Sequence, residues 1–130
     1  MEALREGCVE QCPGCSHRRK TWAESLAQKE GWIRKQLASW GDKVEPVRSV
    51  EENGRWGYRR KILLTARFEN SRWNFGMIRR DEFIAIPGCP VHSPETRQLI
   101  RLLMAVLPPA EAFPLAYLHQ SDALVTLVIK

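Results

Sequence analysis

Residues 57–86, GYRRKILLTARFENSRWNFGMIRRDEFIAI, contain three apolar runs that two short polar segments separate. The runs KILLTARF, WNFGMI and FIAI carry the β-branched and aromatic residues that strands favour, whereas ENSR and RRDE are typical of turns. Runs of this length, joined by turns this short, pair as antiparallel neighbours. The stretch therefore predicts an antiparallel β meander, and this meander decides the fold.

An amphipathic helix is expected on each side of the meander. Upstream, residues 17–41 (HRRKTWAESLAQKEGWIRKQLASWG) carry apolar side chains at helical spacing, and Gly41 suits the end of a helix. Downstream, Ser93 suits the N-cap and Pro94 the first turn of a second helix, which two consecutive prolines end. The residues expected on the buried faces of these helices are Trp22, Leu26, Ile33, Leu37, Trp40, Leu99, Leu102, Leu103 and Val106.

Two further segments resemble strands. The segment VEPVRSV (44–50) is short and β-rich, and the tail DALVTLVIK (122–130) has the alternation of a strand. The predicted fold class is α+β, an antiparallel β meander with two amphipathic helices and an N-terminal Cys-rich metal loop. Residues 1–17 are expected to form this cysteine-rich cluster loop, and residues 18–130 a central α+β domain.

The chain has 130 residues and a formal net charge of +5, from 20 Lys and Arg against 15 Asp and Glu. Such an excess of positive charge suits a polyanionic partner, nucleic acid first. No apolar run approaches the length of a membrane span, and the start MEALREGC lacks the apolar core of a signal peptide. A cytoplasmic, monomeric protein without a membrane partner is therefore expected, and in that compartment cysteines serve as metal ligands or reactive thiols more often than as disulfides.

Three of the four cysteines fall in GCVEQCPGCSH (7–17), and the fourth lies far downstream in IPGCPVH. Four thiolates can complete a tetrahedral zinc shell or hold a 4Fe–4S cluster. Zinc sites usually use two Cys-x-x-Cys pairs, but here only Cys12 and Cys15 form one, with Cys8 close by and Cys89 alone. This spacing favours an iron–sulfur cluster, with zinc as the alternative and a Cys12–Cys15 redox pair as the third reading.

Two histidines and two Pro-Gly pairs lie close to the cysteines and are candidate ligands or supports. His17 and His92 each lie two or three residues from a proposed ligand, so either could replace a cysteine, although surface positions are expected for both. His119 falls in an expected loop and receives no role. The pairs Pro13-Gly14 and Pro87-Gly88 suit backbone turns that point amide groups towards sulfur atoms.

Basic and aromatic side chains occur together at two places. The run Arg18–Lys20 follows the cysteines, and the run Arg59–Lys61 adjoins Trp56 and Tyr58. Cationic groups suit phosphates and exposed aromatic rings stack on unpaired bases, whereas the alternative is an ordinary solvated charged face. The first-helix tryptophans are expected in the core, with Trp56 and Trp73 as the candidate stacking residues.

In their order along the chain, CPGCSH, RWGYRRKILLTARF, FGMIRRDEFIAIPGCPVHSP and the following apolar helix resemble the RNA 5-methyluridine (uracil-5) methyltransferases. The similarity is to the iron–sulfur branch, which is typified by the large-subunit rRNA uracil-5 methyltransferase, and it runs from about residue 8 to residue 130. The chain departs from that family in having three residues, where five are usual, between the first two cysteines. The resemblance implies a 4Fe–4S cluster on Cys8, Cys12, Cys15 and Cys89.

The resemblance also implies an RNA partner, expected to be rRNA. The family's basic strand motif YRxK matches Tyr58, Arg59 and Lys61, in a domain that packs against the catalytic domain and helps to hold the RNA. Together with the first basic run, the candidate RNA-binding residues are Tyr58, Arg59, Lys61, Arg18, Arg19 and Lys20.

Family members attack uracil with a cysteine thiolate and then transfer a methyl group from S-adenosylmethionine, which requires a nucleophilic cysteine and a glycine-rich cofactor loop. This chain has no Gly-x-Gly and no fifth cysteine. We therefore expect a cluster-bearing, RNA-contacting segment that is non-catalytic alone. The missing catalytic domain is its expected partner, and S-adenosylmethionine is expected to bind only in a full-length enzyme. The alternative is a stand-alone structural-zinc or iron–sulfur module that binds RNA or protein.

Overall fold

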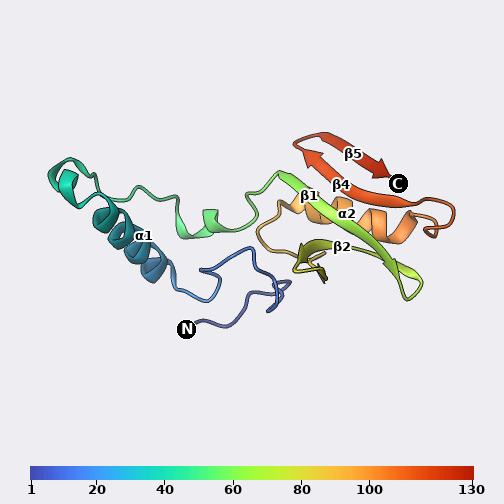
Figure 1. Ribbon diagram of the computed structural model, residues 1–130, viewed down its shortest axis with the longest axis horizontal. Helices are drawn as coiled ribbons and strands as arrows, with labels where there is room; N and C mark the ends of the chain where they lie inside the picture. The colour runs from blue at the N-terminus through green and yellow to red at the C-terminus, as the bar shows by residue number, and fades with distance from the viewer.

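The computed structural model describes residues 1–130 and centres on a five-stranded antiparallel sheet of order β3-β2-β1-β4-β5 (Figure 1). Its α+β class and its antiparallel meander agree with the prediction. No helix is both long enough and apolar enough to span a membrane. The elements are α1 (Trp22–Gln36), η1 (Ala38–Lys43), η2 (Glu52–Arg55), β1 (Lys61–Glu69), β2 (Arg72–Arg79), β3 (Glu82–Ala85), α2 (Pro94–Val106), β4 (Leu115–Ser121) and β5 (Leu124–Ile129).

Two-residue turns set the register of the meander. Glu69 pairs with Arg72 across the first turn, and Arg79 pairs with Glu82 across the second. The residues inside these turns, 70–71 and 80–81, all have positive φ angles of 48–66°. This conformation matches the twist of the flanking strands and is well tolerated by Asn and Asp, which occur in these turns.

The core lies between the sheet and α2. Alternate residues of β1 are buried, and the side chains of Phe75, Ile100 and Leu118 are almost completely inaccessible to solvent. Ser93 caps α2 by accepting a hydrogen bond from the Thr96 amide at 3.2 Å, as the sequence predicts. The prediction that Leu102 and Val106 face the core is wrong, because α2 is rotated so that Thr96, Ile100 and Leu103 point inwards.

Three predictions about the sheet region are also wrong. Residues 44–50 form no strand, since Pro46 removes a backbone donor and no neighbouring strand pairs with them. His119 lies in β4, paired with Leu63 and Thr126, and not in a loop. Trp73 is no stacking candidate because alternation along β2 buries it, and its Nε1 donates to the Pro108 carbonyl at 2.7 Å.

The helix α1 projects away from the sheet (Figure 1). A capping box starts it: Thr21 accepts from the Glu24 amide, and the Glu24 carboxylate accepts from the Thr21 amide. It ends at Gln36, five residues before the predicted stop, and Ser25 is its only buried residue. The expectation that its tryptophans pack in the core is wrong for Trp32 and for Trp40 in η1, which are 60% and 57% exposed because no element covers that face.

Candidate functional site

All four cysteines line one small cavity. Cys8, Cys12 and Cys15 reach it from the N-terminal loop, and Cys89 reaches it from the turn that follows β3. The four thiols are free and half-buried, and apolar side chains such as Ile86 and Val91 form much of the remaining wall. No three Cys, His, Asp or Glu side chains adopt the geometry of a formed metal-ion site. The fold thus gathers the four predicted ligands without placing them in a finished coordination shell.

Short backbone contacts bring the two cysteine-bearing segments together. The Cys8 amide donates to the Arg5 carbonyl at 2.9 Å, and the Cys89 amide donates to the Ile86 carbonyl at 3.2 Å, so each cysteine sits in a tight turn. Gly7 has a φ of +82°, and a Cβ on Gly7 would lie 2.0 Å from the Gly88 carbonyl oxygen. Only glycine permits this approach of the two backbones.

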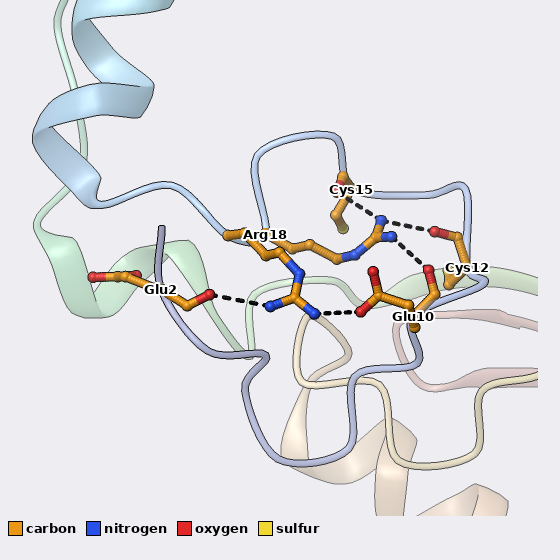
Figure 2. A network of polar contacts seen from close by, with 6 residues as sticks. Glu2, Glu10, Cys12, Cys15 and Arg18 are labelled. Atoms are coloured by element: carbon orange, nitrogen blue, oxygen red, sulfur yellow. Dashed lines mark hydrogen bonds and ion pairs between the residues drawn. The ribbon is translucent and has the colours of Figure 1, made fainter.

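Two arginines hold the cysteine loop (Figure 2). Arg18 donates from its guanidinium to the carbonyls of Cys12 at 2.8 Å, Cys15 at 3.1 Å and Glu10 at 2.6 Å. Arg19 forms an ion pair with the Glu10 carboxylate and donates to the Glu2 carbonyl at 3.4 Å. The first basic run, predicted to contact RNA, therefore also organises the loop, because a guanidinium can serve several carbonyls at once.

The surroundings of Cys8 and Cys15 favour the protonated thiol over the thiolate. Burial raises the pKa of Cys8 and of Cys15, and the neighbouring thiols raise both further. The guanidinium of Arg18 opposes this at Cys8, and that of Arg59 opposes it at Cys15. A metal ion bound here would reverse this balance, because metals bind the thiolate form, and its binding would release protons.

One sulfur receives a backbone hydrogen bond. The Gly14 amide donates to Cys12 Sγ at 3.4 Å, in the Pro-Gly turn where the sequence indicates such a contact. Hydrogen bonds of this kind stabilise thiolate ligands and tune the potential of iron–sulfur clusters. The donor set and this amide therefore fit either a cluster or a thiolate-bound zinc ion.

The histidines occupy different environments. His17 Nδ1 lies 2.8 Å from Ser25 Oγ, and burial followed by the charges of Lys29, Lys20 and Arg55 lowers the pKa of this imidazole. The expectation of a surface position is wrong for His92, which is only 3% exposed. Burial lowers the pKa of His92 to about 4, so its ring stays neutral at physiological pH.

The second basic run lies beside the cysteine turn. Tyr58, Arg59 and Lys61 are exposed. The Arg59 amide donates to the Val91 carbonyl at 3.0 Å, which ties this run to the segment that carries Cys89. Lys20 lines a separate pocket with Arg18, Arg19 and two glutamates.

Arg55 is a site residue that sequence reasoning missed. It donates to the carbonyls of His17 and Lys20, both at 3.0 Å, and so joins η2 to the end of the cysteine loop. Its guanidinium carbon lies 4.9 Å from the ring centroid of Trp56 and 5.5 Å from that of Trp22. No local sequence pattern reveals this arrangement. Apart from Trp56, the residues that Arg55 contacts lie 33 to 38 positions before it in the chain.

These features define an α+β domain with a cavity lined by four thiols and flanked by exposed basic and aromatic side chains. Comparisons with models of protein families, with curated proteins and with solved structures found no match for the chain. The chemistry of the residues themselves is therefore the basis on which a function can be proposed.

Proposed function

We propose that this chain is the iron–sulfur-cluster-binding, RNA-contacting segment of an S-adenosylmethionine-dependent RNA (uracil-5) methyltransferase, directed to ribosomal RNA and non-catalytic alone. The observation that carries the proposal is the convergence of four cysteines on one cavity, although Cys89 lies 74 positions after Cys15. The ordered motifs that resemble this methyltransferase family supply the link to RNA and to methyl transfer.

The donor set supports a 4Fe–4S cluster on Cys8, Cys12, Cys15 and Cys89. Such a cluster takes one thiolate per iron, and an apolar wall with an amide–sulfur hydrogen bond limits solvent access and tunes its potential. Binding requires the four side chains to adjust within the cavity, since they do not form a finished shell. The role we assign to the cluster is structural: it ties the N-terminal loop to the turn after β3, and closing a long loop stabilises a fold.

The RNA-contacting role rests on exposed charge beside this centre. Arg59 and Lys61 can bind phosphates and Tyr58 can stack on an unpaired base, and the net charge of +5 favours the encounter. Methyl transfer is not expected from the chain itself, because its four cysteines are assigned to the cluster and none remains as a nucleophile.

Anaerobic purification, followed by absorbance, iron, sulfide and zinc analysis of one sample, tests the cluster. We expect about four iron and four sulfide per chain with a broad brown absorption band, and loss of most iron in Cys89→Ser. His17→Gln is the matched control and should keep its iron. One zinc without sulfide would instead favour the stand-alone zinc module, and an absence of both metals would refute the site.

Binding to ribosomal RNA fragments at several salt concentrations tests the RNA role. The double variant R59A/K61A should bind more weakly and reduce the slope of log affinity against log salt by about two, one for each lost phosphate contact. The control R79A/R80A removes the same charge from the β2–β3 turn and should change the affinity less. Equal effects would show that only net charge matters, and methylation of uridine by this chain would overturn the non-catalytic assignment.

A further inference from the structure

A second and larger cleft of about 540 Å³ adjoins the cysteine cavity. One wall is the loop of residues 14–18, of which Cys15 and Arg18 also line the cysteine cavity. The facing walls come from α1, η2 and the residues just before β1. Its volume lies in the range of pockets that hold small organic ligands. The lining residues that matter for its chemistry are Trp22, Lys29, Arg55, Trp56 and Tyr58.

The charge of this cleft has one sign. Arg18, Lys29 and Arg55 contribute to its lining, and no Asp or Glu does. Arg18 is held by carbonyls of the cysteine loop. Lys29 is exposed on α1, so its side chain is the one most free to reorient towards a bound anion. A concave site with only cationic groups concentrates anions and disfavours cations.

The cleft also presents flat π surfaces. The guanidinium of Arg55 lies near the rings of both Trp22 and Trp56, and the Lys29 ammonium is 5.8 Å from the Trp22 centroid. Tyr58, which also lines the cleft, is 57% exposed. Exposed aromatic rings and arginine planes are the surfaces on which unpaired bases stack, and the ring contacts hold the Arg55 plane in place beforehand.

We propose that this cleft holds a single unpaired nucleotide of the bound RNA, with its base against Tyr58 and the Arg55 plane and its phosphate towards Lys29. The inference rests on the proposed function and extends it, because it assigns recognition to Lys29 and Arg55 and specifies a nucleotide outside any duplex. A paired base cannot enter, since its faces are already stacked and its edges are occupied.

The test uses the full chain with its metal and an RNA hairpin that carries one 4-thiouridine, placed either in the loop or in the stem. Illumination should cross-link the loop position, and peptide mapping should place the link within residues 54–58 or on α1. Binding is measured in parallel for Lys29→Glu and for Lys35→Glu, which makes the same charge change on the same helix outside the cleft lining. We expect Lys29→Glu to weaken binding about tenfold and Lys35→Glu less than twofold.

The outcomes separate this inference from the proposed function. If the wild-type chain binds no RNA, both fail. The cleft alone is refuted if the chain binds RNA and R59A/K61A weakens that binding, while Lys29→Glu and Lys35→Glu change the affinity equally. A cross-link that maps to the sheet would also refute the cleft alone. Circular dichroism of both variants shows whether α1 is intact, which removes unfolding as a cause.

Discussion

Substitution of Gly7 by alanine tests how the cysteine loop is positioned. Gly7 combines a φ of +82° with an approach to Gly88 in which an added Cβ would lie 2.0 Å from the carbonyl oxygen and 2.9 Å from the carbonyl carbon. Both of these atoms are backbone atoms, so no side-chain rotation relieves the contact. The Cβ reaches an ordinary contact distance only if the loop moves more than 1 Å away from the turn that carries Cys89.

The magnitude follows from the two separate costs. The left-handed conformation costs an alanine about 1–2 kcal/mol, and a forced overlap in a packed site costs about 1–3 kcal/mol. The reduced freedom of alanine in the unfolded chain returns about 0.4–1 kcal/mol. The docked loop therefore loses roughly 2–4 kcal/mol relative to the undocked loop, which weakens metal binding by about one and a half to three orders of magnitude.

The assay is iron and zinc retention during anaerobic competition with a chelator, alongside urea denaturation of the metal-free chain. Gly88→Ala is the control, because a Cβ at Gly88 would meet the Gly7 Cα at 3.4 Å, an ordinary contact. Gly7→Ala should lose metal readily and lower the midpoint of sheet unfolding much less than Phe75→Ala does, because the loop meets the core only through partly buried side chains such as Val9 and Cys12. Equal metal retention in the two variants would refute the idea that this backbone approach aligns Cys8 with Cys89.

Four further predictions concern stability, pH and metal removal. Phe75→Ala should lower the free energy of unfolding by about 3–5 kcal/mol in urea denaturation, because Phe75 is fully buried, and a cost below about 1 kcal/mol would contradict its place in the core. Thr21→Ala should reduce helicity by circular dichroism, since the lost cap costs about 1 kcal/mol. The hydrogen bond from the backbone N–H of Thr21 lowers the pKa of Glu24, so the folded state favours the Glu24 carboxylate. The stabilisation of the fold by this carboxylate is present above the ordinary pKa of Glu and is lost as the pH falls through the lowered pKa. Acid titration of helicity should therefore show a low-pH decrease that Glu24→Gln lacks. Removal of metal by a chelator should weaken RNA binding, because Cys15 and Arg18 line both the cysteine cavity and the cleft, and unchanged affinity would show that the two sites are independent.

Local rules determine the features that the sequence predicts correctly. The polar segments ENSR and RRDE place residues that tolerate positive φ at two hairpin turns, and the alternation within β1 then selects the buried face. Ser93 and Pro94 start α2 because a cap needs only the next three residues. These features follow from interactions within a few positions of the chain.

The burial of a side chain does not follow from such local rules, because it depends on which other element covers that face of its helix or strand. Trp32 lies at a helical position that suits a core, yet nothing packs on it, whereas Trp73 is buried by a helix and a proline segment from beyond β3. The tail predicted as a strand at 122–130 forms β5, but its partner β4 contains His119, for which the sequence predicts a loop.

The sequence by itself determined the meander, the cap of α2 and the four thiols that a metal centre would need. Only the tertiary structure decided that these thiols share one cavity, that Arg18 and Arg55 hold its loop, and that a cationic, aromatic cleft lies beside it. The physical reason is the range of the forces involved: turns and caps are satisfied by neighbours in the chain, whereas a cavity is formed by segments that meet only after the chain has folded.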